Sequence, residues 1–268
     1  MSRNGIRLRG CPRVFECTRP QLLRNRSVPI LDGGYASDVP KSLTGEHVEH
    51  VSQKVMTQND IPQLSPIVLG SRSPRRRELL ALLVPSERIL VLPPSDPDEP
   101  GFEGLRDEAA IADQLRQIAR MKNDNVRTRG ECPREALVLT ADTVIVAGDP
   151  GAYVVLGQPP TCSEWRATVR EWFYSHYFHR MHRAMTAVVL SHADGRSWEQ
   201  IVETRVTMGP PDPALLDWYL NTDEPLGKAG GYALQGAGSV FIERVEGSLS
   251  NVVGLPLEAV RQLLQEVM

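Results

Sequence analysis

The stretch that most constrains the fold is residues 67–83, IVLGSRSPRRRELLALL. Its apolar start, Ile67–Leu69, is typical of a short buried strand, and Gly70 suits a tight turn after it. Ser73 is a favourable N-cap residue, and Pro74 is tolerated at the first helical position, where its missing N–H costs nothing. The pattern predicts a strand, a turn and a helix in succession. Four leucines give this helix an apolar face: Leu79, Leu80, Leu82 and Leu83.

Such a junction is suited to binding an anion. Free backbone N–H groups and the positive end of the helix dipole point at one spot, and Arg75, Arg76 and Arg77 follow directly. Guanidinium groups match phosphate oxygens bidentately, so we expect a phosphate ligand. No Gly-Lys-Ser/Thr follows the turn, which distinguishes it from a P-loop. The alternative is a capped amphipathic helix with solvated arginines.

Composition restricts the partners and the compartment. With 268 residues the chain can form one large domain or two small ones, and its net charge of −3 argues against non-specific nucleic-acid binding. Four cysteines without a C-x-x-C spacing favour free thiols in a reducing compartment. No apolar run is as long as a membrane span, and the N-terminus has no hydrophobic signal core. We therefore expect a cytoplasmic protein without nucleic-acid or membrane partners.

Residues 1–60 differ from the rest of the chain. They carry many arginines, scattered Pro and Gly, and no sustained periodicity, so we expect them to be disordered or loosely attached. Glu16 is the one acidic residue among the first thirty, which superficially resembles a transit peptide. We favour the hypothesis that translation starts at or near Met56 and that the upstream part is a gene-model artefact. The mass of the intact protein from its native source tests this.

From residue 67 onward, strand-like and helix-like segments alternate. The expected strands after the first are 88–92, 136–141, 144–147, 184–190, 200–208 and 240–245. The expected helices after the first are 105–126, 163–182, 213–220 and 256–268. An Asp194-Gly195 turn joins two of the strands as an antiparallel pair. The alternation predicts an α/β protein with some antiparallel pairing, and therefore a mixed central sheet.

Two acidic positions are candidates for chemistry. Asp142 directly follows the apolar segment 136–141, where functional side chains of α/β sheets commonly emerge. A carboxylate that faces a phosphate pocket can bind a divalent cation or accept a proton from an attacking water. The alternative is an aspartate that caps a turn. Glu99 follows a Pro-rich loop with Asp96 and Asp98, a cluster that suits either Mg²⁺ or a solvated acidic loop.

Residues 226–238 form a second glycine-dense segment. Glycines allow the backbone to approach a ligand closely, Lys228 adds a point charge for phosphate, and Gln235 offers an amide that can read a base edge. The alternative is a flexible loop before the next strand.

Three histidines, His176, His179 and His182, lie near the end of the expected helix 163–182. A spacing of three places them partly around a helix, and no carboxylate or cysteine joins them at a standard zinc spacing. We favour a helix surface or core edge over a metal cluster.

Four segments, taken as a set, resemble the Maf family of nucleoside triphosphate pyrophosphatases, also called septum-formation inhibitor proteins. They are Leu69-Gly-Ser-Arg-Ser-Pro-Arg-Arg-Arg-Glu-Leu-Leu80, Ser95-Asp-Pro-Asp-Glu99, Leu139-Thr-Ala-Asp-Thr-Val144 and Glu224-Pro-Leu-Gly-Lys-Ala-Gly-Gly-Tyr-Ala-Leu-Gln-Gly236. The resemblance extends over residues 65–268 and implies one domain there. It implies a two-lobed α/β fold of the Maf/ITPase type, with the nucleotide in a cleft between the lobes, and it is compatible with a homodimer.

The resemblance implies hydrolysis of the α–β phosphoanhydride to a nucleoside monophosphate and pyrophosphate. It makes Asp142 the proton acceptor, and Glu99 and Asp142 the ligands of a divalent metal cation, Mg²⁺ or Mn²⁺. The residues implied to face the phosphates are Ser71, Ser73, Arg76, Lys122 and Lys228. We therefore expect Arg76 and Asp142 to open onto one cavity.

Specificity also follows from the resemblance. The branch that accepts dTTP and UTP has Arg after the Ser-Pro, Thr after the catalytic Asp and Gln in the late loop, and Arg75, Thr143 and Gln235 match all three. A pyrimidine preference is implied, with modified pyrimidine nucleotides as further substrates. The branch that prefers 7-methyl-GTP has Trp, Gln and Glu at these positions.

One departure from the family pattern suggests a different function. Gln158 stands where the family usually has a lysine, so a positive charge is missing. This favours a nucleotide-binding regulator of cell division with low or no turnover as the alternative. A protein of the inosine triphosphate pyrophosphatase type is disfavoured by the Ser-Pro-Arg-Arg and Ala-Asp-Thr segments.

Overall fold

A mixed sheet, with seven strands among the residues that the structure describes, organises the fold. The structure, a computed structural model, describes residues 66–95 and 99–267, which belong to one compact unit. The strands are β1 (Ile67–Leu69), β2 (Ile89–Val91), β3 (Leu137–Ala147), β4 (Val154–Leu156), β5 (Met181–Ser191), β6 (Ser197–Met208) and β7 (Ile242–Glu246). They run in the order β2-β1-β3-β5-β6-β7, and β4 pairs with β3 outside this path. β1 pairs in parallel with β2 and β3, and the other pairs are antiparallel.

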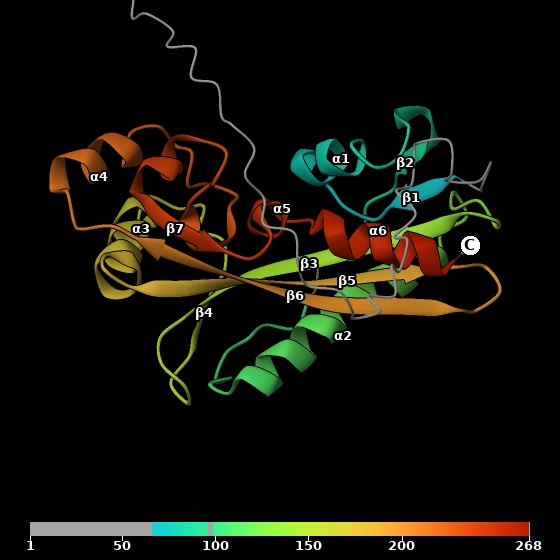
Figure 1. Cartoon of the computed structure of the whole chain (residues 1–268), viewed down its shortest axis with the longest axis horizontal. Coiled ribbons are helices and arrows are strands. Elements are labelled where there is room, and N and C mark those ends of the chain that lie inside the picture. Colours follow the sequence, from blue (N-terminus) through green and yellow to red (C-terminus); the bar gives the residue numbers. More distant parts are fainter. Residues whose placement is uncertain (1–65, 96–98, 268) are drawn as a thin grey trace, which may run out of the picture. The chain divides into compact units, whose positions relative to one another are not determined.

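Helices cover both faces of the sheet (Figure 1). They are α1 (Pro74–Leu80), α2 (Glu108–Arg127), α3 (Trp165–Trp172), α4 (Pro213–Leu220), α5 (Leu249–Val253) and α6 (Leu257–Glu266). Alternate residues of β3 face opposite layers, because side chains of a strand alternate between its two sides. Val144 and Val146 pack with residues of α2, whereas Leu137 and Leu139 pack with residues of α1 and α6. A strand that is buried on both faces needs apolar residues on both of its sides, as found at the two ends of β3, in Leu137–Leu139 and Val144–Ala147.

Two lobes form on the face of the sheet opposite to α2. The first lobe packs α1 and α6 against β1 and the first half of β3. The second lobe packs α3 and α4 around a set of aromatic rings, with Phe173 at the centre, in contact with Tyr219 and Phe241. The predicted two-lobed α/β fold with a mixed central sheet is confirmed.

The boundaries of α1 and β3 differ from those expected. α1 ends at Leu80, and Leu82 is exposed instead of completing an apolar face. The expected interruption between 136–141 and 144–147 is wrong, because Asp142 and Thr143 continue the antiparallel pairing with β5. Asp142 therefore lies in the middle of a strand rather than at its end.

The expected helix over residues 163–182 ends early. α3 continues into a short π-helix, Phe173–Tyr177, and β5 begins at Met181. His179 lies between them with a positive φ of 56°. The Phe173 and Tyr177 rings are fully buried in the second lobe, and burying these rings outweighs the helical periodicity of the segment.

The three histidines consequently lie in different elements, and the expectation that one helix carries them is wrong. His182 belongs to β5, its side chain is fully buried, and its Nε2 lies 2.8 Å from the Tyr232 Oη. Burial lowers the pKa of His182 to about 3. Within residues 66–95 and 99–267, no three His, Cys, Asp or Glu side chains are grouped so that they could hold a metal ion.

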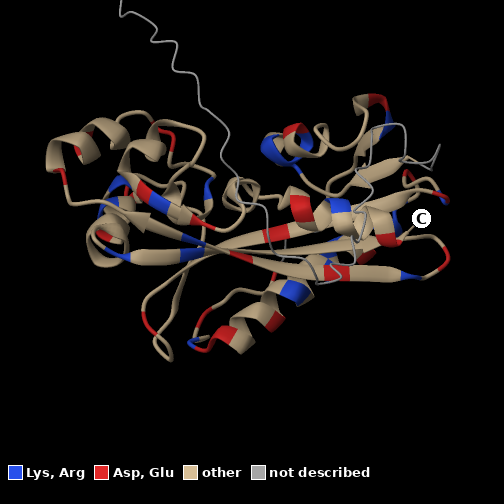
Figure 2. Cartoon of the chain, in the orientation of Figure 1, with Lys and Arg blue, Asp and Glu red and all other residues tan. Residues whose placement is uncertain are grey.

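Charged residues are interspersed over the fold, with a run of basic residues at α1 (Figure 2). None of the described helices is long and apolar enough to cross a membrane. The expectations for residues 1–60 concern a part of the chain outside the described residues.

Candidate functional site

The site forms at an interrupted edge of β3. One edge of this strand pairs with β5 along most of its length. The other edge pairs with β1 up to Leu139 and with β4 from Ile145 onward, so residues 140–144 have no strand partner on that side within the described part of the chain. β1 and β4 approach this gap from opposite directions, each with its carboxyl end, and the loops that follow them open onto it. Ligands of open α/β sheets commonly bind where neighbouring strands diverge in this way.

Close contacts fix the turn between β1 and α1. A Cβ on Gly70 would lie 2.6 Å from the Thr140 Cγ2, so a larger residue at this position would have to displace the Thr140 side chain. The Ser71 hydroxyl accepts a hydrogen bond from the backbone N–H of Ser73 at 3.2 Å. The Ser73 hydroxyl accepts one from the backbone N–H of Arg76 at 3.4 Å, as expected for an N-cap residue. The strand, turn and helix cap predicted from the sequence are confirmed.

The Arg76 guanidinium connects segments that are far apart in the sequence. Its Nε donates to the Gly254 carbonyl at 2.8 Å. Its terminal nitrogens donate to the hydroxyls of Thr143 at 3.0 Å and Ser71 at 3.3 Å. Burial lowers the pKa of Arg76, and the nearby Asp142 carboxylate opposes that effect. Arg76 therefore braces the wall of the site and keeps N–H groups that these bonds do not use.

Lys122 joins two carboxylates at the centre of the site. Its Nζ lies 2.5 Å from the Asp142 Oδ1 and 2.9 Å from the Glu99 Oε2. The side chains of Lys122 and Asp142 are 13% and 15% exposed, whereas that of Glu99 is 41% exposed. Asp142 lies on the same side of β3 as Thr140, whose hydroxyl donates to the Ala119 carbonyl of α2. The two carboxylates therefore converge on one cation position beside α2.

Two neighbouring residues of β3 reach the site from opposite faces of the sheet. Asp142 faces α2, whereas Thr143 faces the side that carries Arg76 and the end of α5. Because no described strand pairs with residues 140–144 on this side, the two faces of the sheet meet around the open edge. Arg76 and Asp142 line the same cavity, as we expected.

The loop after α4 supplies another wall. The Glu224 carboxylate accepts hydrogen bonds from the backbone N–H groups of Ala237 at 2.8 Å and Gly238 at 2.9 Å. The Lys228 Nζ donates to the Glu224 carbonyl at 3.0 Å and to a second carbonyl of the same loop at 3.3 Å. Burial lowers the pKa of Lys228, and the positive charge of Arg75 lowers it further. The glycine-dense segment is thus an ordered wall rather than a free loop.

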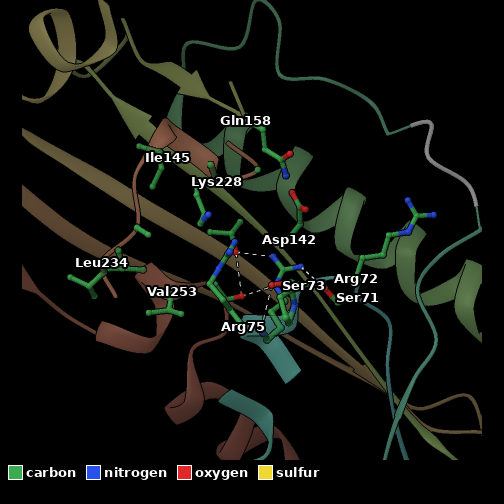
Figure 3. Close-up of a pocket in the computed structure, with 18 of the residues that line it drawn as sticks. Ser71, Arg72, Ser73, Arg75, Asp142, Ile145, Gln158, Lys228, Leu234 and Val253 are labelled. Carbon is green, nitrogen blue, oxygen red and sulfur yellow. Dashed lines mark hydrogen bonds between the residues drawn. The ribbon is translucent and has the colours of Figure 1, made fainter. Parts of the chain in front are cut away.

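These elements enclose a cavity with a volume of about 520 Å³ (Figure 3). Every site residue predicted from the sequence lines it: Ser71, Ser73, Arg75, Arg76, Glu99, Lys122, Asp142, Thr143, Lys228 and Gln235. The roles of these residues stay predictions. Among the described residues that line the cavity, five side chains are cationic and two are anionic, an excess of positive charge that suits a polyanion.

Sequence reasoning missed part of the lining. Arg72, between the two serines of the turn, lines the cavity, whereas only the arginines after Pro74 had been predicted from the sequence. Its position within the same Ser-Arg-Ser turn was the signal that could have identified it. An apolar wall, formed by Ile145, Leu234, Val252 and Val253, was also missed, because these residues come from three segments that are far apart in the sequence.

Comparison with known proteins identifies relatives over the described part of the chain. The family model "Maf-like protein" matches residues 66–267. A dTTP/UTP pyrophosphatase from Anaeromyxobacter dehalogenans (strain 2CP-1) is 39% identical over 202 residues, covering 74% of this chain and 92% of that protein. One from Myxococcus xanthus is 38% identical over 200 residues, covering 74% and 91%. A solved structure of a HAM1 protein from Coxiella burnetii is 13% identical, with a TM-score of 0.44, and covers 76% of this chain and 100% of that one.

Proposed function

The chain belongs to the Maf family, and from this membership we propose that it is a nucleoside triphosphate pyrophosphatase that acts on dTTP and UTP. The observation that supports this most is the single cavity in which the Asp142 carboxylate faces an excess of cationic side chains. A triphosphate is a polyanion of the kind that such a cavity attracts. The relatives named dTTP/UTP pyrophosphatases cover 74% of the chain, and the family model spans residues 66–267, which include the residues that line this cavity.

The proposed reaction is the attack of water on the α-phosphorus. A bond forms between the water oxygen and this phosphorus, the bond to the bridging oxygen breaks, and pyrophosphate leaves with that oxygen. Asp142 accepts the proton of the attacking water. Positive side chains stabilise the charge on the phosphate oxygens, which is the main task in phosphoryl transfer. We assign contacts with the phosphates to Ser71, Ser73, Arg76, Lys122 and Lys228.

Glu99 and Asp142 are suited to hold a divalent cation. Their oxygens converge on one position, which the Lys122 ammonium takes in this structure. Mg²⁺ is often bound by one or two carboxylates together with substrate phosphates, so this pair fits without a third protein ligand. When bound, Mg²⁺ or Mn²⁺ neutralises charge on the reacting phosphate. A chelator is expected to abolish turnover and added Mg²⁺ to restore it; full activity in the chelator would contradict this assignment.

The nucleobase is proposed to lie against the wall that the glycine-dense segment, residues 226–238, contributes to the cavity. Leu234 and Val253 offer apolar surface for a ring, and the Gln235 amide can both donate to and accept from a base edge. Arg75 and Thr143 complete the set that we assign to pyrimidine specificity. The Thr143 hydroxyl also accepts a hydrogen bond from Arg76, so it fixes the wall as well as facing the ligand.

A substrate panel tests the proposal. The protein is incubated with dTTP, UTP, CTP and 7-methyl-GTP in the presence of Mg²⁺, and pyrophosphate release is measured. We expect release from dTTP and UTP and little from 7-methyl-GTP. If dTTP binds but no nucleotide yields pyrophosphate, the result favours a nucleotide-binding regulator, for which Gln158 is the supporting observation.

A further inference from the structure

Three of the five cations in the cavity are already engaged by the protein. Lys122 contacts the two carboxylates, Asp142 and Glu99. Arg76 donates to three oxygens of the cavity wall, and Lys228 donates to two carbonyls of its own loop. An incoming phosphate must share these groups with their present partners.

Arg72 is engaged much less. Its one hydrogen bond in the described part of the chain is a long contact of 3.4 Å from a terminal nitrogen to the Pro94 carbonyl. Its side chain is exposed, and no carboxylate of the described residues lies within ion-pair distance. Arg75 likewise has no carboxylate partner there, and its charge acts on Arg76 and Lys228. Arg72 and Arg75 are thus the cavity cations that can offer a complete guanidinium fork to a ligand.

These two arginines lie toward different ends of the cavity. Leu234, Val253 and Lys228 lie on one side of Asp142, and the Arg72 side chain extends on the other side (Figure 3). Contacts support this order, because Arg72 bonds Pro94, and Pro94 lines a small neighbouring hollow together with Glu99 and Lys122. The sequence of features along the cavity is therefore the apolar wall, the acid and then Arg72.

We propose that Arg72 binds the terminal phosphate of the nucleoside triphosphate, an inference that rests on the proposed function. A base against the apolar wall and an α-phosphate beside Asp142 direct the remaining phosphates away from the wall, toward Arg72. The guanidinium fork matches two oxygens of a terminal phosphate. Arg72 is thereby a positioning residue for the leaving pyrophosphate, and its exposed place at the open end allows that product to depart.

The test compares ligands that differ only in the terminal phosphate. Affinities for the α,β-methylene analogues of dTTP and dTDP are measured by calorimetry with Mg²⁺, for the wild type, Arg72→Ala and Arg77→Ala. Arg77 is the control because it is an exposed arginine of α1, close to Arg72 in the sequence, that does not line the cavity. We expect Arg72→Ala to weaken triphosphate binding by roughly tenfold or more, and diphosphate binding by less than about twofold. Arg77→Ala is expected to change neither.

Equal weakening of both analogues, or of neither, in Arg72→Ala would overturn the inference. Arg72→Lys keeps the charge without the fork, so it is expected to recover part of the triphosphate affinity. The analogues are not hydrolysed at the α–β bridge, so binding is measured independently of turnover. A wild type that binds the triphosphate analogue yet releases no pyrophosphate from dTTP would contradict the proposed function alone.

Discussion

Replacement of Arg76 with alanine tests whether this side chain braces the cavity. The substitution removes three hydrogen bonds, but their acceptors are left in different situations. The Ser71 hydroxyl keeps its bond from the Ser73 backbone N–H, and the Thr143 hydroxyl keeps the Thr186 hydroxyl at 2.9 Å. The Gly254 carbonyl loses its 2.8 Å donor and keeps only a longer contact of 3.4 Å with the Thr143 hydroxyl.

The expected loss in the free energy of unfolding follows from the bonds that remain. A buried acceptor that loses its partner costs about 1–3 kcal/mol. Two effects reduce this cost. Water can enter the open cavity and bond the exposed acceptors. The substitution also removes a guanidinium whose charged form is disfavoured by burial, as its lowered pKa indicates. We therefore expect the free energy of unfolding to fall by about 1–2 kcal/mol.

Urea denaturation of Arg76→Ala, with Arg75→Ala as the matched control, measures this change. Arg75 precedes Arg76 on the same helix and lines the same cavity, and its side chain makes no hydrogen bond or ion pair within the described residues. Its removal also relieves repulsion from Arg76 and Lys228, so we expect no loss of stability. Equal destabilisation by the two substitutions would contradict this expectation. The loss of a positive charge, rather than the loss of the hydrogen bonds of Arg76, would then explain the change in stability.

Other predictions concern the remaining walls of the site. Gln158→Lys is expected to raise kcat/KM for dTTP, because it adds a cation to the cavity; an unchanged value would mean that another group, such as Arg72, already supplies that charge. Glu224→Ala leaves the backbone N–H groups of Ala237 and Gly238 without their acceptor, so KM for dTTP is expected to rise by roughly tenfold with little change for kcat; a normal KM would show that the loop holds its shape alone. Because the pKa of His182 is about 3 when folded and near 6.5 when unfolded, protonation favours the unfolded state between these values. The wild type should therefore be about 2 kcal/mol less stable at pH 5 than at pH 7 through this group, and urea denaturation of His182→Gln should lack that part of the loss.

Local signals predicted the elements that carry their own start and stop residues. The Ser73-Pro74 and Asp212-Pro213 pairs predicted the starts of α1 and α4, and both caps form as expected. The turn at Asp194-Gly195 predicted the β5–β6 hairpin. These outcomes depend on interactions within a few residues, so the sequence is sufficient to predict them.

Long-range packing decided the features that were predicted wrongly. Asp142 and Thr143 stay within β3 because β5 supplies partners for both, and no residue near them in the sequence reveals that pairing. The helix over 163–182 ends early because Phe173 and Tyr177 are buried among rings from later segments. The apolar wall of the cavity was missed for the same reason, since it exists only after the two lobes have come together.

Turnover and nucleotide binding of Asp142→Asn test the proposed role of this carboxylate. The amide keeps the size of the side chain but is a poor proton acceptor, so pyrophosphate release from dTTP is expected to fall by on the order of a hundredfold or more. Binding of the α,β-methylene analogue of dTTP is expected to persist. An Asp142→Asn protein that releases pyrophosphate at the rate of the wild type would contradict the proposal that this carboxylate accepts the proton of the attacking water.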